Sequence, residues 1–177
     1  MSLLNMALVA LDLPHTGANW YTHARDFADE TSARQGIKRA SVVGVMAALS
    51  PQVRWDYQIA HTDRFVASEL REIGSGTFPG YGRNLTKARG VLHSGKDPLA
   101  ILRGPKVTAF YRCIMGDPDA VVIDRHAARA AGLDPDNLTM KRYRDCADLY
   151  RTVAAACAVS PRQLQAAIWN LQRRLTA

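Results

Sequence analysis

Helical spacing of apolar residues runs through nearly the whole chain and is the feature that most limits its fold. Apolar side chains recur at three- and four-residue intervals, and no stretch alternates apolar and polar residues with a period of two for long. Proline and glycine cut this pattern into pieces of helical length, for example at Ser50-Pro51, Gly104-Pro105 and Gly116. We therefore predict an all-α protein with about eight or nine helices.

The ends of these helices have recognisable capping signals. Ser160-Pro-Arg-Gln163 reads as a capping box with proline in the first turn, and Leu164, Ile168, Leu171 and Leu175 then form an apolar stripe typical of a core-facing helix. Ala120–Ile123 is predicted to be extended and buried, with Asp124 at the start of a short helix. The predicted helices cover 3–33 with a break near Pro14–Gly17, 38–49, 55–70, 85–95, 98–102, 105–116, 124–132, 139–157 and 161–175.

The size and charge of the chain limit the kind of protein it can be and the partners it can bind. The chain has 177 residues, 47% of them apolar and 22% charged, which suits one domain, or two small lobes sharing a core. Lys and Arg number 23 against 16 Asp and Glu, giving a net charge of +7. This balance favours an anionic partner, with nucleic acid first and a membrane surface second. A basic protein that binds nothing anionic is the alternative.

Targeting signals and cysteines point to the cytoplasm. The longest apolar run, 42–49, is too short to cross a bilayer, and the N-terminus lacks the pattern of a secretory signal. The chain has an odd number of cysteines, Cys113, Cys146 and Cys157, and no Cys-x-x-Cys motif. We therefore expect buried thiols and neither a structural zinc ion nor an iron–sulfur cluster. We expect no metal site, because the Asp124-x-His126 pair has no convincing third ligand.

Three segments together carry the functional signal, although each is weak alone. They are Ala48-Leu-Ser-Pro-Gln52, Leu102-Arg-Gly-Pro-Lys106 and Val121-Val-Ile-Asp124-Arg-His126-Ala-Ala-Arg129. Taken singly, Asp124 is most often a helix N-cap and Lys106 a solvated surface lysine. The order and spacing of the three segments favour a functional interpretation over a helix cap and a surface lysine.

This arrangement resembles the helix-hairpin-helix base-excision DNA glycosylases of the endonuclease III type, over about residues 38–132. Gln52 matches the glutamine of that family's Leu-Ser-x-Gln segment, while Gly104 and Lys106 match the glycine and lysine of its hairpin. Val122-Ile-Asp124-Arg-His126-Ala-Ala-Arg129 resembles the segment that contains the family's catalytic aspartate. Gly80-Tyr-Gly-Arg-Asn-Leu-Thr-Lys-Ala88 is similar to the segment ahead of the hairpin.

Some features depart from the family pattern. The hairpin reads Leu-Arg-Gly-Pro-Lys, with one glycine missing and a proline inserted, and the cluster-binding cysteines of endonuclease III are absent. The pattern also resembles a phage branch linked to hypermodified thymine, of the kind that includes α-glutamyl and putrescinyl thymine pyrophosphorylases. Members of that branch are thought to add groups to an activated base or remove them.

The resemblance implies roles for single residues. Asp124 would stabilise the positive charge that builds on the sugar as a glycosidic bond breaks. Lys106 would attack C1′ and form a Schiff base, which adds strand-nicking lyase activity, or would instead remain charged and hold a phosphate. Gln52 would fill the gap left by an extruded base. His126 would orient Asp124 or cap its helix.

The fold, partners and activity expected from the resemblance can be stated together. We expect one compact glycosylase-like domain with a central cleft between two lobes, 38–116 with the hairpin and 1–37 plus 117–177. We expect a monomer that binds DNA and no membrane, without a cofactor, although related hairpins hold a monovalent cation through backbone carbonyls. The residues expected to contact DNA are Gln52, Arg83, Lys87, Arg103, Gly104, Arg125 and Arg129.

Three activities are compatible with these features. The first is a DNA glycosylase, with or without lyase activity, that excises an extruded modified or damaged base. The second is a phage base-modifying transferase that acts on hypermodified pyrimidine in DNA. The third is a DNA-binding protein that has the same fold and no catalysis.

Overall fold

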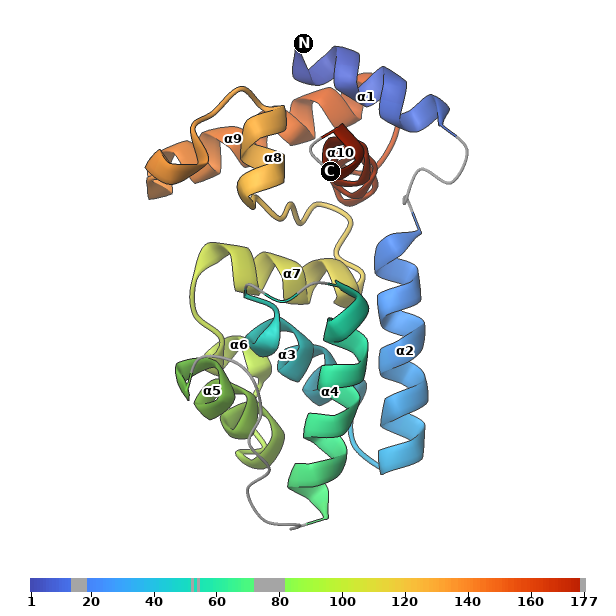
Figure 1. Cartoon of the computed structure of the whole chain (residues 1–177), viewed down its shortest axis with the longest axis vertical. Helices are drawn as coiled ribbons and strands as arrows, with labels where there is room; N and C mark the ends of the chain where they lie inside the picture. The colour runs from blue at the N-terminus through green and yellow to red at the C-terminus, as the bar shows by residue number, and fades with distance from the viewer. Residues whose placement is uncertain (14–18, 52, 54, 72–81, 176–177) are drawn as a thin grey trace. The chain divides into compact units, whose positions relative to one another are not determined.

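The chain folds into helices alone over the part that the structure describes. The computed structural model describes residues 1–13, 19–51, 53, 55–71 and 82–175. Within these ranges there are ten α-helices, one short 3₁₀-helix and no strand (Figure 1). The prediction of an all-α protein is therefore confirmed, with slightly more helices than expected.

Helix boundaries follow the capping signals closely. Helix α4 spans Trp55–Leu70, as predicted. At the start of α10 (Pro161–Leu175), the Ser160 hydroxyl accepts from the Gln163 amide at 3.3 Å, and the Ser160 amide donates to Gln163 Oε1 at 3.2 Å. This reciprocal pair is the capping box that the sequence predicts.

The chain divides into two compact units. Unit 1 comprises Met1–Thr22 and Gly116–Ala177, and unit 2 comprises His23–Met115. The sequence suggested lobes of 1–37 plus 117–177 and 38–116. The two divisions differ in residues 23–37, which belong to unit 2, and in Gly116, which belongs to unit 1.

Unit 1 is built around α10. This helix contacts α1 (Leu3–Asp12), α8 (Arg125–Ala130) and α9 (Met140–Ala156), while the 3₁₀-helix η1 (Pro135–Asn137) lies against α8. Leu164 and Ile168 are fully buried, as the predicted stripe requires. Leu175 is 61% exposed, so the prediction is wrong there: the buried stripe ends at Leu171.

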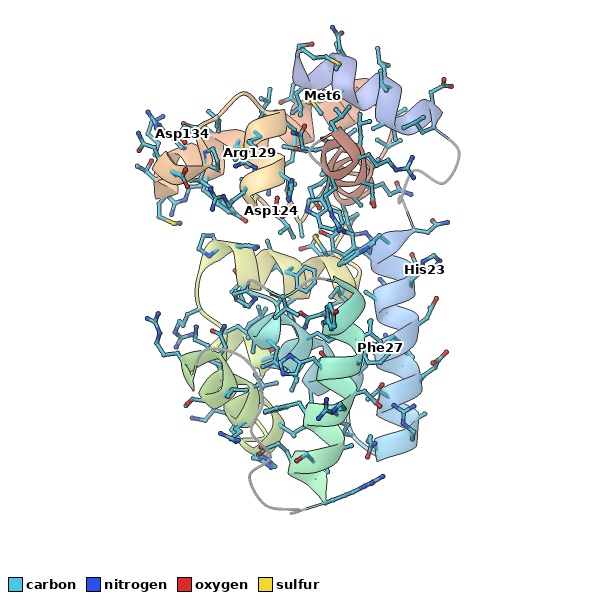
Figure 2. The ribbon with its side chains drawn as sticks, in the orientation of Figure 1. Met6, His23, Phe27, Asp124, Arg129 and Asp134 are labelled. Atoms are coloured by element: carbon cyan, nitrogen blue, oxygen red, sulfur yellow. The ribbon has the colours of Figure 1, made fainter. Side chains whose placement is uncertain are left out.

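Unit 2 is built around α3 (Arg39–Leu49). Every residue from Val42 to Leu49 is buried, so the helix is apolar on all sides, as expected of a core helix. It contacts α4, α5 (Gly82–His93), α6 (Pro98–Ile101) and α7 (Pro105–Met115). Helix α2 (Trp20–Gln35) begins in unit 1 and belongs to unit 2 from His23, a residue labelled on it in Figure 2.

A close helix crossing in unit 2 depends on a glycine. A Cβ atom at Gly44 of α3 would lie 2.7 Å from Val91 Cγ1 on α5 and 2.9 Å from Pro98 Cβ on α6. These distances are shorter than any van der Waals contact. Glycine is therefore required here by packing, in the middle of a helix where it is otherwise unfavourable.

We predict that Gly44→Ala lowers the free energy of unfolding by about 1 to 2 kcal/mol. Overpacking costs ~1–3 kcal/mol and outweighs the ~1 kcal/mol gained in helix propensity. Gly90→Ala is the matched control, because among the described residues its Cβ would meet only the Ile101 side chain, at 3.5 and 4.0 Å, which is ordinary van der Waals contact, and it should be neutral or stabilising. Urea denaturation of both variants measures the difference, and equal effects would show that the crossing is not tight.

Candidate functional site

Asp124 lies where a buried segment without regular secondary structure becomes a helix. Val121, Val122 and Ile123 are each at most 5% exposed, and Asp124 follows them as the N-cap of α8. Its Oδ1 accepts from the Ala127 amide at 2.9 Å, and the side chain is partly buried. Figure 2 labels Asp124 at the start of α8 and Arg129 further along the same helix. The expected N-cap role is therefore present.

The second oxygen of Asp124 is bound by a residue from another helix. Trp169 of α10 donates its indole N–H to Oδ2 at 2.8 Å, across 45 residues of sequence. Each carboxylate oxygen thus accepts one N–H, and the two donors come from α8 and α10. The carboxylate is held in one orientation, and each oxygen retains a second lone pair that can accept a further hydrogen bond.

The Trp169 side chain has aromatic and cationic neighbours. Its ring lies 5.9 Å from the Trp20 ring and 6.2 Å from the His126 ring, in tilted and edge-on arrangements. The Arg173 guanidinium lies over it at 4.8 Å from the ring centroid, within the range of a cation–π contact. The indole that holds Asp124 is itself fixed by contacts from three elements.

A buried hydrogen bond anchors the first turn of α2 beside this cluster. The Tyr21 hydroxyl donates to Gln165 Oε1 of α10 at 2.6 Å, and both side chains are buried. The Tyr21 ring also packs edge-on against Trp20 at 4.9 Å. These contacts tie Trp20 to the same helix that carries Trp169.

His126 contacts Trp169, and no hydrogen bond joins it to Asp124 among the described residues. Its Nδ1 atom is buried and has no hydrogen-bond partner within that part of the chain. The orienting role expected for His126 is occupied by the Trp169 indole, while His126 packs against the edge of the same ring.

Two buried tyrosines support the backbone around Asp124. The Tyr143 hydroxyl accepts from the Ile123 amide at 3.2 Å and donates to the Val121 carbonyl at 3.3 Å. Tyr150 donates to the Ala127 carbonyl at 3.1 Å. Burial, and then the nearby Cys146 and Asp124, raise the pKa of Tyr150 well above its ordinary value, so the phenol remains a donor.

Cys146 is a buried thiol on α9. Burial raises the pKa of Cys146 to about 11, and the neutral thiol packs among apolar side chains. Cys113 is also buried and Cys157 is partly exposed, and all three are free thiols. Among the described residues, no group of three or more His, Cys, Asp or Glu side chains is arranged to hold a metal ion.

The hairpin with Lys106 belongs to unit 2. The chain turns at Arg103 and Gly104 between α6 and α7, and Gly104 has a φ of +90°, which strongly favours glycine. Helix α7 then starts at Pro105, where a missing N–H has no cost. Lys106 follows in the first turn, partly exposed and without an ion pair to any described residue. Lys106 thus belongs to unit 2, whereas Asp124 belongs to unit 1.

Positive charge is concentrated around this hairpin. Unit 2 has 14 Lys and Arg against 8 Asp and Glu, a net +6, whereas unit 1 has 9 against 8, a net +1. Residues 82–115, which contain α5 to α7, have seven basic residues and a single acidic one, Asp97. Among the described residues only Arg89 of these seven has an ion pair, with Glu69 at 2.9 Å.

The residues expected to contact DNA fall in both units. In unit 2, Arg83 and Arg103 are exposed and Lys87 is partly buried. In unit 1, Arg129 is exposed, and Arg125 forms an exposed ion pair with Asp136 at 3.0 Å. Gln52 lies outside the described residues.

Trp20 and Trp169 are the site residues that sequence reasoning missed. Trp169 directly follows Ile168 of the apolar stripe in α10, so it is easily taken as one more core residue. The sequence offers one signal of a polar role for Trp169: a tryptophan that packs inside a protein needs an acceptor for its indole N–H. Nothing in the spacing shows that the acceptor is Asp124.

The chain belongs to a protein family described as a family of unknown function (DUF7178), whose pattern matches residues 10–175. No curated protein and no solved structure matches the chain significantly. The match covers both units, including the Asp124 site and the hairpin with Lys106.

None of the described helices combines the length and the apolar character needed to cross a membrane.

We predict that alkaline pH destabilises the protein through Cys146. The thiol ionises near pH 9 when unfolded and near pH 11 when folded, so the folded state binds more protons between these values. The stabilisation is complete below pH 9 and is lost as pH rises toward 11, at about 1.4 kcal/mol per pH unit. Tyr150 acts in the same direction above pH 10.

Unfolding by urea at several pH values measures this slope. Cys146→Ala should flatten it between pH 9 and 10, whereas Val153→Ala, a non-titrating truncation of the same buried helix face, should leave it unchanged. An identical slope in wild type and Cys146→Ala would contradict the assignment.

Proposed function

We propose that the protein is a DNA glycosylase-like enzyme that acts on a modified or damaged base extruded from DNA. Asp124 is its catalytic carboxylate, Lys106 its amine, and the basic segment 82–115 its main DNA-binding surface. On this proposal the two units correspond to the two lobes of a helix-hairpin-helix glycosylase fold. The observation that carries the proposal is the Asp124 carboxylate, which is fixed by N–H donors from two helices.

The geometry of Asp124 suits stabilisation of a cationic sugar. Rupture of the bond between C1′ and the base builds positive charge on the sugar, and a carboxylate that is already oriented needs no rearrangement to stabilise it. A carboxylate that only capped a helix would need the bond to Ala127 and nothing more. The additional indole donor is what favours a role beyond capping.

Lys106 would supply the second function. The neutral amine attacks C1′, the bond from C1′ to the base breaks and the base departs with the bonding electrons. The attached nitrogen gives up one proton, which the departing base takes up. The C1′–O4′ bond then breaks, O4′ takes a proton from water, and a protonated Schiff base joins Lys106 to C1′. If Lys106 remains charged, it holds a phosphate, and the enzyme releases the base by hydrolysis alone.

The charge distribution supports DNA as the partner. Six of the seven basic residues in 82–115 have no ion pair with a described residue, so their charge is available to phosphates. The Gly104 turn brings exposed backbone to the start of α7, which is the kind of site where backbone amides can approach a phosphate.

We predict that Asp124→Asn lowers base release by about 10²- to 10⁴-fold, the usual effect of losing a catalytic carboxylate. Wild type, Asp124→Asn and Lys106→Ala are incubated with duplexes that carry different modified bases. Free base is measured by chromatography, a covalent adduct by borohydride trapping, and the intact base by mass spectrometry. Lys96→Ala, which removes an exposed lysine of the same unit, is the control for Lys106→Ala.

Each outcome of that experiment has one meaning. Free base that depends on Asp124 supports a glycosylase, and an adduct lost only in Lys106→Ala adds lyase activity. A changed mass on a base that stays in the DNA supports the base-modifying transferase instead. Absence of any product, with DNA binding retained, supports a binding protein without catalysis and overturns the proposed activity.

We predict that Arg83→Ala/Arg103→Ala reduces the salt dependence of DNA affinity. Each lost phosphate contact lowers the slope of log K against log salt by about 0.9. The charge-matched control is Arg34→Ala/Arg39→Ala, because these arginines are already paired with Asp63 and Asp29. Fluorescence anisotropy at several salt concentrations compares them, and equal slopes would show that 82–115 is not the DNA-binding surface.

A further inference from the structure

We infer that Trp169 is a positioning residue for Asp124: its indole N–H fixes the plane of the carboxylate for the reaction. This inference rests on the proposed function, since it assigns a second residue to the same site. Its physical basis is the 2.8 Å bond from Trp169 Nε1 to Asp124 Oδ2.

The helix cap alone does not fix a carboxylate. The bond from the Ala127 amide holds one oxygen, and the group can still rotate so that its two equivalent oxygens exchange. A second donor on the other oxygen prevents this rotation. Trp169 is that donor, and no other hydrogen bond to Oδ2 occurs among the described residues.

Trp169 is suited to the task because its own position is determined by packing. Gln165, one turn before it on α10, is 3% exposed and is anchored by a hydrogen bond from Tyr21. The indole is then bounded by the Trp20 ring, the His126 ring and the Arg173 guanidinium. A donor with restricted motion orients its acceptor at little entropic cost.

The neighbouring polar groups do not replace this donor. The Tyr150 hydroxyl is engaged with the Ala127 carbonyl, and His126 meets the ring of Trp169. Loss of the indole N–H should therefore leave Oδ2 without an orienting partner from the protein. Phenylalanine at position 169 removes the N–H and keeps an aromatic ring.

We predict that Trp169→Phe lowers kcat for base release by about 10- to 100-fold without weakening DNA binding, because misorientation of a reacting group has effects of this size. The duplex is the one that wild type processes in the experiment above. Ile168→Val, a small core truncation on the same helix, controls for general loss of stability and should retain wild-type kcat. All variants are assayed well below their melting temperatures.

An NMR measurement tests the bond without any substrate. The protein has three tryptophans, so ¹⁵N-labelled indoles give three N–H cross-peaks, and Trp169→Phe identifies the one from Trp169. A donor to a carboxylate is deshielded, so Asp124→Asn should move this peak to lower proton chemical shift. The same peak should remain in place in Ile168→Val.

The two proposals fail in different ways. If Asp124→Asn releases base as fast as wild type, the proposed function is wrong. If Asp124→Asn is inactive while Trp169→Phe retains wild-type kcat, the proposed function stands and the positioning role is wrong. A Trp169 cross-peak that does not respond to Asp124→Asn also overturns the positioning role.

Discussion

The interaction on which unit 1 depends is the binding of one carboxylate by two helices. Asp124 follows a buried segment without regular secondary structure, caps α8 through the Ala127 amide and receives the indole N–H of Trp169 from α10. A partly buried carboxylate is costly unless its oxygens are hydrogen-bonded, and here both are. The same two bonds join the start of α8 to α10.

The surrounding aromatic residues make this arrangement rigid. Tyr143 binds the backbone on both sides of Val122, and Tyr150 binds the first turn of α8. The Tyr143 hydroxyl binds buried backbone groups that lie outside the helices. The Tyr150 hydroxyl binds a carbonyl of α8 that already accepts a backbone hydrogen bond. The cluster is thus a connected polar network inside an apolar core, and such networks specify one conformation when every member is satisfied. The buried Nδ1 of His126, which lies beside this network, has no hydrogen-bond partner within the described part of the chain.

Local signals in the sequence were sufficient for most of the helices and for Asp124. The cap at Asp124, the capping box at Ser160 and the turn at Gly104 each depend on a few neighbouring residues, and all three are present. The Trp169 bond could not be predicted, because its partners are 45 residues apart and an apolar stripe hides the indole donor. For the same reason the stripe prediction fails at Leu175, where burial depends on neighbours that the periodicity does not reveal.

Under the proposed function, binding and chemistry have different physical requirements, and the two units differ in the corresponding way. Binding to phosphates needs exposed, unpaired positive charge, and residues 82–115 of unit 2 carry nearly all of the chain's excess. Stabilisation of a cationic sugar needs a carboxylate with fixed orientation in a partly dry setting, and near-neutral unit 1 provides one at Asp124. A strongly positive surface around the carboxylate would oppose this role, because it would weaken the field that a cationic transition state experiences. The low net charge of unit 1 is therefore as relevant to the proposed chemistry as the high charge of unit 2.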